Sequence, residues 1–460
     1  MNLQRGSLLK TTAALFILPL VIACIGCGGR HKGKSDSAKA EENNEEVVEP
    51  SRKANNHPLD FKLYMERSGS MVSFDSENSK GEFKGIVSTL LNRFPQVQRN
   101  DSTDVYIVND NIYPYEGTVK EFLAQRDFFS STKDIGNPSY TDFDRIFEMI
   151  LTDTKKYQVS ALVTDMIYSV KGQETVSASK LLNEAYALTH NVFKGKTHTS
   201  VIVLKFEADY NGPYYPYNSP SVGVPYNGNR PFYVMLFASK DTMEELYYSE
   251  EYSSFINFST LPSFENMFCF TSMQFTPGYS ILLDYDHEGR YRMDKEKKRE
   301  GKSKFVTAIS NAQLSKDGSI TIPIALDLSH LPLSNSYKKN KDYYEIESKG
   351  GFEIKSIKSI EELDPNEILK VKESLPTATH LLVLESETKP LNEEVKIKML
   401  YKLPDWISKS SSRDDSQISS DNFSSTTFGF EEVMKGMYGA YVPDGTSHFI
   451  FDIAFTIKKK

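Results

Sequence analysis

The chain has 460 residues, of which 39% are hydrophobic and 25% are charged, and its formal net charge is −8. This length allows two or three domains that each bury a core of their own. The composition is typical of a soluble protein rather than of a disordered or membrane-spanning chain. The excess charge is negative and no stripe of Lys and Arg alternates with aromatic residues, so we expect no nucleic-acid partner.

The amino terminus has the layout of an export signal. Two basic residues precede an apolar run over residues 13–23, and small residues and cysteines follow it, which is the order found in secretory signal peptides. Residues 1–23 are therefore predicted to be a signal peptide. The stretch "VIAC" resembles the lipobox of bacterial lipoproteins, which implies that Cys24 becomes the lipidated first residue, with Cys27 as the alternative. An uncleaved anchor and a plain secretory signal stay open, although a membrane span takes about 20 apolar residues.

Residues 24–57 are rich in charge and poor in aromatic residues, a composition that favours a disordered tether. A lipid anchor at its start would hold the folded part away from a membrane, on the extracytoplasmic side of a bacterial cell envelope. If both early cysteines belong to the anchor, Cys269 is the only thiol of the folded part. An intramolecular disulfide is then excluded, and the core must be stable without one.

Residues 58–258 alternate between strand and helix patterns. This alternation predicts an α/β domain with a doubly wound, mostly parallel sheet that is covered by helices on both faces. Ligands of such sheets bind beyond the carboxyl ends of the strands. The expected strands span 60–66, 102–110, 157–165, 198–209 and 230–239, and the expected helices span 81–94, 118–129, 141–151, 178–193 and 241–256.

A stretch rich in Tyr, Pro, Gly and Asn lies between two of these strands, over residues 210–229. This composition predicts a long surface loop. Its tyrosines could form a recognition surface, since exposed tyrosines suit interfaces, or could pack the loop onto a neighbouring domain. Both interpretations remain open for Tyr210, Tyr214, Tyr215, Tyr217 and Tyr226.

Residues 259–460 contain alternating apolar and polar segments separated by turn-forming residues, together with one helical pattern before the last strand. This layout predicts an antiparallel, sandwich-like β-region of one or two domains. Signals for catalysis are absent from the whole sequence: the histidines are scattered without metal-ligand spacing, and no phosphate-binding glycine loop occurs. We expect a protein that is not an enzyme, with a hydrolase as a minor alternative.

The stretch "YMERSGSM" carries the clearest chemical signal. Glu66, Ser68 and Ser70 directly follow the first predicted strand, Thr141 is predicted to cap a helix, and Asp165 ends a later strand. All of these positions face the carboxyl edge of the predicted sheet. Carboxylate and hydroxyl oxygens are hard ligands, so together with water they suit Mg²⁺ or Mn²⁺.

This constellation resembles the metal-ion-dependent adhesion site of von Willebrand factor type A domains. That family has a DxSxS motif after its first strand, a threonine that opens a helix and an aspartate that ends a later strand. The resemblance covers residues 58–258 and leaves the β-rich remainder outside. The matching positions are Ser68, Ser70, Thr141 and Asp165.

Two positions depart from the family pattern. Glu66 stands where the family usually has aspartate, and Met166 stands where a glycine often follows the distal aspartate. The resemblance implies a Mg²⁺ or Mn²⁺ ion with one coordination position left for an acidic group of a partner. It also leaves open a degenerate site in which the same side chains only bond to one another.

The expected function is that of a lipid-anchored, extracytoplasmic binding protein that engages a protein or a glycan through this cation. The alternative is a structural scaffold of an envelope assembly with a degenerate metal site. A hydrolase is a weaker alternative because Glu66 and Ser70 occupy the positions where the nucleophile motif GxSxG requires glycines.

Overall fold

The computed structural model of the chain describes residues 57–99, 104–170, 172–294, 305–442 and 448–458. The predicted signal peptide, nearly all of the predicted tether and the candidate lipidation residues Cys24 and Cys27 lie outside the described residues. Within the described residues, no helix combines the length and the apolar character that a membrane crossing requires.

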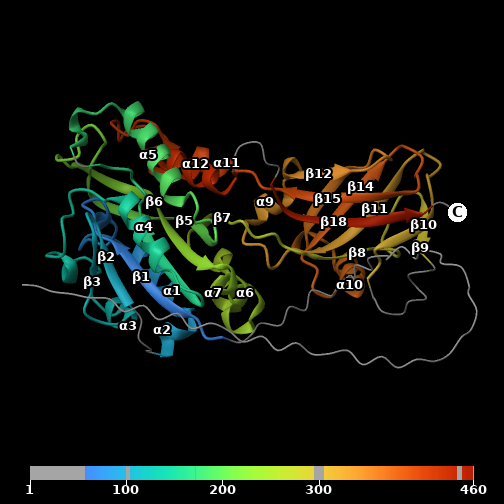
Figure 1. The fold of residues 1–460 in the computed structure, drawn as a ribbon, viewed down its shortest axis with the longest axis horizontal. Helices are drawn as coiled ribbons and strands as arrows, with labels where there is room; N and C mark the ends of the chain where they lie inside the picture. The colour runs from blue at the N-terminus through green and yellow to red at the C-terminus, as the bar shows by residue number, and fades with distance from the viewer. Residues whose placement is uncertain (1–56, 100–103, 171, 295–304, 443–447, 459–460) are drawn as a thin grey trace, which may run out of the picture. The chain divides into compact units, whose positions relative to one another are not determined.

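A seven-stranded sheet forms the first half of the fold (Figure 1). The strand order is β3-β2-β1-β4-β6-β5-β7, and only the pairs β1/β2 and β1/β4 are parallel. The prediction of a mostly parallel sheet is therefore wrong outside the strands β2, β1 and β4. Its strands are β1 (Asp60–Glu66), β2 (Asp104–Val108), β3 (Ile112–Pro114), β4 (Gln158–Thr164), β5 (Thr199–Tyr214), β6 (Val224–Ser239) and β7 (Phe264–Phe270).

The mixed order has a simple origin in strand connections. Parallel neighbours need a crossover connection, whereas antiparallel neighbours can be joined by a short turn. Strand β5 turns directly into β6 at residues 215–223, so β6 runs antiparallel to β5 and takes the place beside β4. A local strand pattern gives no information on this choice of neighbour.

Helices cover both faces of this sheet, as expected (Figure 1). Successive β1 residues point to opposite faces: Leu63 and Met65 join one apolar cluster and Tyr64 joins another. The first cluster is covered by α1 (Glu82–Asn92), α2 (Pro95–Arg99), α3 (Val119–Leu123), α6 (Lys240–Tyr248) and α7 (Ser253–Ile256). The second is covered by α4 (Phe143–Asp153), α5 (Ala178–Phe193) and α12 (Phe430–Tyr441).

The predicted loop over 210–229 is wrong, because most of it belongs to a long β-hairpin. Strands β5 and β6 remain paired out to Tyr214 and Val224. Prolines are tolerated there because this part of the hairpin has no third strand beside it among the described residues. Tyr210 and Tyr214 are buried, so for these two the packing interpretation holds.

The seven-stranded sheet extends beyond residue 258, the expected domain boundary. Strand β7 forms its edge, and the carboxyl-terminal helix α12 packs beside α5 (Figure 1). The two helices are close enough that a Cβ added at Gly436 would lie 2.6 Å from the carbonyl oxygen of Tyr186. Short elements lead to this helix: α11 (Asp405–Lys409), β16 (Ser411–Ser412) and β17 (Thr427–Phe428).

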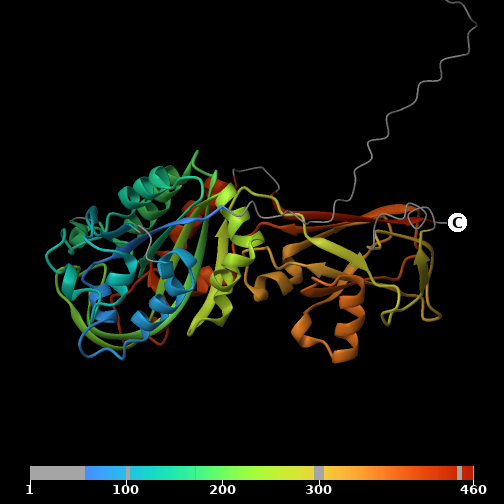
Figure 2. The ribbon, with the colours of Figure 1, turned by 90° about the horizontal axis from the view of Figure 1, so that it is seen from below.

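The β-rich remainder contains two facing sheets whose inner side chains belong to one apolar cluster (Figure 2). The five-stranded sheet has the order β12-β15-β18-β10-β9 and the four-stranded sheet β13-β14-β11-β8. Helix α10 (Pro365–Ser374) covers the outer face of the smaller sheet, and α9 (Asn335–Lys339) precedes β12. The strands are β8 (Gly278–Ile281), β9 (Arg290–Met293), β10 (Ala308–Gln313), β11 (Ile320–Asp327), β12 (Tyr344–Glu347), β13 (Glu353–Ser359), β14 (His380–Ser386), β15 (Glu393–Leu400) and β18 (Phe449–Lys458).

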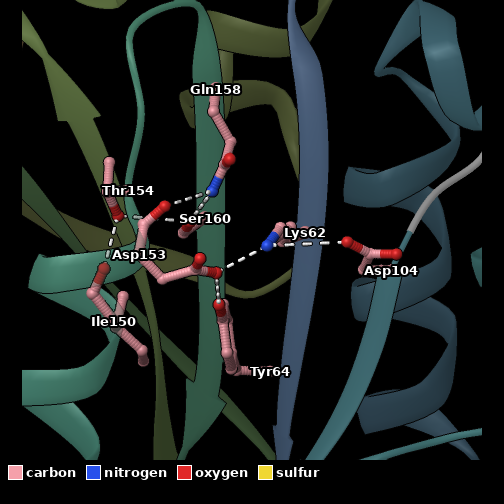
Figure 3. A network of polar contacts seen from close by, with 8 residues as sticks. All are labelled: Lys62, Tyr64, Asp104, Ile150, Asp153, Thr154, Gln158 and Ser160. Atoms are coloured by element: carbon pink, nitrogen blue, oxygen red, sulfur yellow. Dashed lines mark hydrogen bonds and ion pairs between the residues drawn. The ribbon is translucent and has the colours of Figure 1, made fainter.

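A polar network joins the amino-terminal part of the three parallel strands (Figure 3). Lys62 Nζ donates to Asp153 Oδ2 at 2.5 Å, and Tyr64 Oη donates to the same oxygen at 3.1 Å. Asp104 lies 3.5 Å from the ammonium group. Burial would raise the pKa of Asp153, but the hydrogen bond and charge of Lys62 bring it below its usual value. Lys62 therefore supplies the positive charge that balances Asp153 and Asp104 in this network.

Candidate metal centre

The strand map places the predicted carboxylates at one edge of the sheet. Glu66 is the last residue of β1, and Asp165 directly follows β4. These strands are parallel neighbours, with Met65 paired to Val163. Because parallel strands end at the same edge, the two carboxylates come together although they are far apart in sequence.

Thr141 reaches the same edge, but in a different role from the predicted one. The helix begins at Phe143, and its N-cap is Asp142, whose side chain accepts a hydrogen bond from Arg145 N at 3.2 Å. A carboxylate serves well as an N-cap, and this leaves the Thr141 hydroxyl free to donate to Glu66 Oε1 at 2.5 Å. The prediction that Thr141 is the cap is therefore wrong, while its predicted place at the site agrees with the structure.

The hydroxyl groups of the site form a connected network. Ser68 Oγ and Ser70 Oγ lie 3.1 Å apart. The Ser68 hydroxyl lowers the pKa of Glu66, and the Ser70 hydroxyl lowers the pKa of Asp165. The five predicted site residues thus belong to one cluster that spans three separate segments of the chain.

Both carboxylates are buried, with exposed fractions of 1% for Glu66 and 2% for Asp165. Burial and the neighbouring Asp165 charge raise the pKa of Glu66, and hydrogen bonds from Thr141, Thr164 and Ser68 oppose that rise. Burial likewise raises the pKa of Asp165, and the Ser70 hydroxyl and the charge of Arg230 oppose that rise. Within the described residues neither carboxylate has a Lys, Arg or His ion-pair partner.

One atom of this cluster lacks a partner. Asp165 Oδ1 accepts a hydrogen bond from Ile167 N at 3.1 Å, whereas Asp165 Oδ2 is buried and has no hydrogen-bond partner. Buried polar atoms are rarely left in this state. An unsatisfied carboxylate oxygen beside a second carboxylate fits a site for a positive charge.

The donor set matches a hard cation. It consists of two carboxylates and three hydroxyls, the oxygen ligands that Mg²⁺ accepts together with water. The described residues contain no group of three or more His, Cys, Asp or Glu side chains suited to a metal. A cation at this site would therefore rely on the hydroxyls of Ser68, Ser70 and Thr141 as well as on the acids.

The loop after Asp165 keeps a backbone conformation that favours glycine. Met166 has φ +55°, in the left-handed region, which costs a non-glycine residue about 1–2 kcal/mol. Two features offset this cost: the Met166 side chain is fully buried, and its N–H donates to Thr164 Oγ1 at 2.8 Å. The loop after Asp165 thus holds a left-handed backbone at Met166 without a glycine.

A cavity of about 450 Å³ opens over the cluster. Glu66, Ser68, Ser70 and Thr141 lie at its base, and its walls come from the loop before α4, the loop after β4 and the tip of the β5–β6 hairpin. None of the described residues that line it is Lys, Arg or His. The described part of the lining therefore presents acid and hydroxyl oxygens.

Several participants escaped sequence analysis. Thr164 donates to Glu66 Oε2, and Ser169 Oγ accepts from Thr141 N at 3.3 Å. The hydroxyl next to Asp165 in "VTDM" was a usable signal for Thr164. Tyr215 and Tyr217 were noted only as loop tyrosines, yet both line the cavity.

Asp110 and Asp142, two further acids near the site, serve local structure. Asp142 caps α4, and Asp110 accepts from Asn137 N at 2.9 Å.

Comparison with known protein families, with curated proteins and with solved structures finds no match for this chain.

Proposed function

We propose that this chain is a lipid-anchored, extracytoplasmic binding protein whose seven-stranded domain is of the von Willebrand factor type A kind. In this proposal the domain engages a protein or glycan ligand through Mg²⁺ or Mn²⁺ held at the carboxyl edge of β1 and β4. The export signal and the "VIAC" stretch of the sequence support the anchor at Cys24, or at Cys27.

The observation that carries the proposal is the pair of buried carboxylates without a cationic partner. The charge of Asp165 raises the pKa of Glu66, and Asp165 Oδ2 has no hydrogen-bond partner. Isolated buried charge is expensive, and a paired cation removes that expense. At the opposite end of the same strands, Lys62 supplies such a cation to Asp153. Among the described residues, Glu66 and Asp165 have no ion-pair partner of this kind.

Each side chain has a defined part in this proposal. Glu66 and Asp165 supply negative charge, and the hydroxyls of Ser68, Ser70 and Thr141 supply neutral oxygens. Thr164 holds Glu66 in place through its second carboxylate oxygen. A bound divalent cation would supply a positive charge with a free coordination position for an acidic group of the ligand.

Calorimetric titration of Mg²⁺ and Mn²⁺ into the chelator-stripped protein tests the proposal. We expect saturable one-site binding, a higher melting temperature with cation, and loss of both in Asp165→Asn, which keeps the side-chain shape. Asp317→Asn, at an exposed turn, is the matched control and should bind as the parent does. Absence of binding heat and of a thermal shift in the parent protein would refute the proposal.

One observation favours the second candidate, a scaffold with a degenerate site. Both carboxylate oxygens of Glu66 already accept hydrogen bonds, from Thr141 and from Thr164, so this acid is satisfied without an ion. The scaffold function predicts that Asp165→Asn leaves assembly in the envelope unchanged. The cation-dependent function predicts that the same variant loses its ligand while its fold is retained.

A further inference from the structure

The tip of the β5–β6 hairpin forms a wall of the cavity above the proposed cation site. Tyr215, Tyr217, Pro220 and Ser221 line the cavity from this tip. The tip also carries Val222, which is 64% exposed and is one of few large apolar side chains exposed to this degree among the described residues. Val222 is not among the residues that line the cavity, so we call Tyr215, Tyr217 and Pro220 the tip wall. The cavity thus has an oxygen-rich base and an apolar side.

The tip wall is fixed from the carboxyl-terminal segment by Asp415. This residue is 2% exposed, and its carboxylate accepts hydrogen bonds from Tyr214 Oη at 2.5 Å and from Tyr217 N at 3.0 Å. Its contact with Tyr214 joins residues 201 positions apart. Asp415 therefore holds the last residue of β5 and a cavity-lining residue at the same time.

Two more contacts brace the same region. Gln173 Nε2, from the loop after β4, donates to Tyr217 O at 3.2 Å. The buried Arg230 guanidinium lies 4.7 Å from the ring centre of Tyr214 and 4.1 Å from that of Phe423, within cation–π range. Because the loop after β4 and the carboxyl-terminal segment both hold the tip, its apolar side chains are presented in a defined position.

The tyrosine rings of the tip wall offer little open face. A Cβ added at Gly69 would lie 2.9 Å from the Tyr215 ring, and one added at Gly223 would lie 3.2 Å from it. Phe428 stacks on Tyr217 with ring centres 4.9 Å apart and planes 9° apart. Sugars commonly pack their flat C–H faces on an open aromatic ring, so these covered rings favour side-on contact with an aliphatic side chain.

The charges point to the same kind of ligand. The charged side chains among the described residues that line the cavity are the acids Glu66 and Glu174. An acidic group of the ligand would complete the coordination of a bound divalent ion, and an apolar neighbour of that group would contact the tip wall. Such a pair of adjacent groups is a feature of protein segments.

We propose that the tip wall is the specificity determinant of this site, and that it selects a protein segment in which an acidic side chain is followed or preceded by an aliphatic one. Asp415 is the positioning residue of this wall. The inference rests on the proposed cation-dependent function and adds to it a choice of protein over glycan.

The test compares two labelled pentapeptides with blocked ends, measured by fluorescence anisotropy with the purified protein in saturating Mg²⁺. Both have aspartate at the centre, flanked by leucine in one and by serine in the other. We expect the leucine peptide to bind about tenfold more tightly, as expected for the burial of a few methylene groups. Equal affinities, or tighter binding of an acidic oligosaccharide such as polygalacturonate, would overturn the inference.

Variants separate the wall from the cation site. Pro220→Ser should lose most of the leucine preference while its Mg²⁺ affinity stays within twofold of the parent. Val222→Ser, which alters an exposed apolar side chain of the same tip outside the cavity lining, should keep the preference. A leucine preference that persists in Pro220→Ser would contradict the role of the wall.

Asp415→Asn keeps the shape of the side chain but replaces one acceptor oxygen by a donor. We expect it to weaken the leucine preference and to leave Mg²⁺ affinity unchanged, a split that a general loss of folding would not produce. If Mg²⁺ binding itself is absent in the parent protein, the proposed function fails. If Mg²⁺ binds but the peptides are not distinguished, only the further inference fails.

Discussion

Strands β1 and β4 carry polar groups toward both of their ends, and the two ends differ in one respect. Near the amino-terminal end, Asp153 and Asp104 share the ammonium group of Lys62, and Tyr64 completes the network (Figure 3). At the carboxyl end, Glu66 and Asp165 lie deeper and have no cationic side chain between them. The acids at one end have an ion-pair partner, and among the described residues those at the other end have none.

This difference separates a structural polar network from a candidate binding site. The pKa of Asp153 is lowered because its partner Lys62 outweighs burial. The pKa of Glu66 is raised because burial and Asp165 outweigh its hydrogen bonds. Acids that the fold leaves uncompensated in this way are concentrated at functional sites. Three variants and one pH measurement test this difference.

The largest effect is expected for Glu66→Gln. It removes a charge but keeps the side-chain length and an oxygen for the hydroxyls of Thr141 or Thr164. We expect Mg²⁺ affinity to fall about 100-fold, as for loss of a charged ligand, when measured by calorimetry. Asp153→Asn, at the other end, is the control and should bind Mg²⁺ within twofold of the parent. Similar losses in both variants would remove the distinction between the two ends.

A smaller effect is expected for Thr141→Val, which keeps the shape of the side chain. It removes the hydroxyl that donates to Glu66 Oε1. We expect about a tenfold loss of Mg²⁺ affinity, the size typical of a group that ligates weakly or orients a ligand. Thr152→Val, on an exposed part of α4, should have no effect on the same titration. An unchanged affinity in Thr141→Val would leave Thr141 outside the site.

Lys62→Met tests the network at the amino-terminal end of the strands, where the acids have a cationic partner. It leaves Asp153 without its cation in a half-exposed position, and we expect a loss of about 1 kcal/mol in the free energy of unfolding, after allowance for solvent. Mg²⁺ affinity should stay unchanged. The control is Lys156→Met, whose exposed pair with Asp241 should contribute almost nothing. Denaturant titration measures both variants, and an equal effect in the two would contradict a special role for Lys62.

The smallest effect concerns acid pH. A carboxylate whose pKa is lowered by folding stabilises the fold above its unfolded pKa, about 3.9 for aspartate, and loses that contribution as the pH falls toward the lowered folded value. The contribution of Asp153 should therefore disappear below about pH 4. Denaturant unfolding at pH 6 and pH 3 should show a smaller pH dependence in Lys62→Met than in the parent, by a few tenths of a kcal/mol. An identical pH dependence would mean that Lys62 does not lower the pKa of Asp153.

Much of the site could be predicted because it depends on local patterns. The apolar segments 60–66 and 157–165 predict strands, and the residues that end them lie at one edge once those strands are parallel. This reasoning brought Glu66 and Asp165 together correctly. It placed Thr141 at the right edge but in the wrong role, because a neighbouring acid, Asp142, competes for the cap.

Other features had no local signal. The composition of residues 210–229 predicts a loop, yet pairing along the whole hairpin overrides that preference. Asp415 lies in a polar stretch that resembles any surface turn, and only its contacts with Tyr214 and Tyr217 distinguish it. Strand β6 between β4 and β5 likewise depends on long-range pairing.

Most strands and helices, the residue types at the carboxyl ends of β1 and β4, and the ligand chemistry of those oxygens could be read from the sequence. These follow from side-chain periodicity and from the hardness of the donor atoms, which are local properties. The mixed strand order, the β5–β6 hairpin, the orphan oxygen of Asp165 and the contacts of Asp415 with that hairpin arise only in the folded chain. These depend on which distant segments pack together, and that is set by the burial of whole faces rather than by any short stretch of residues.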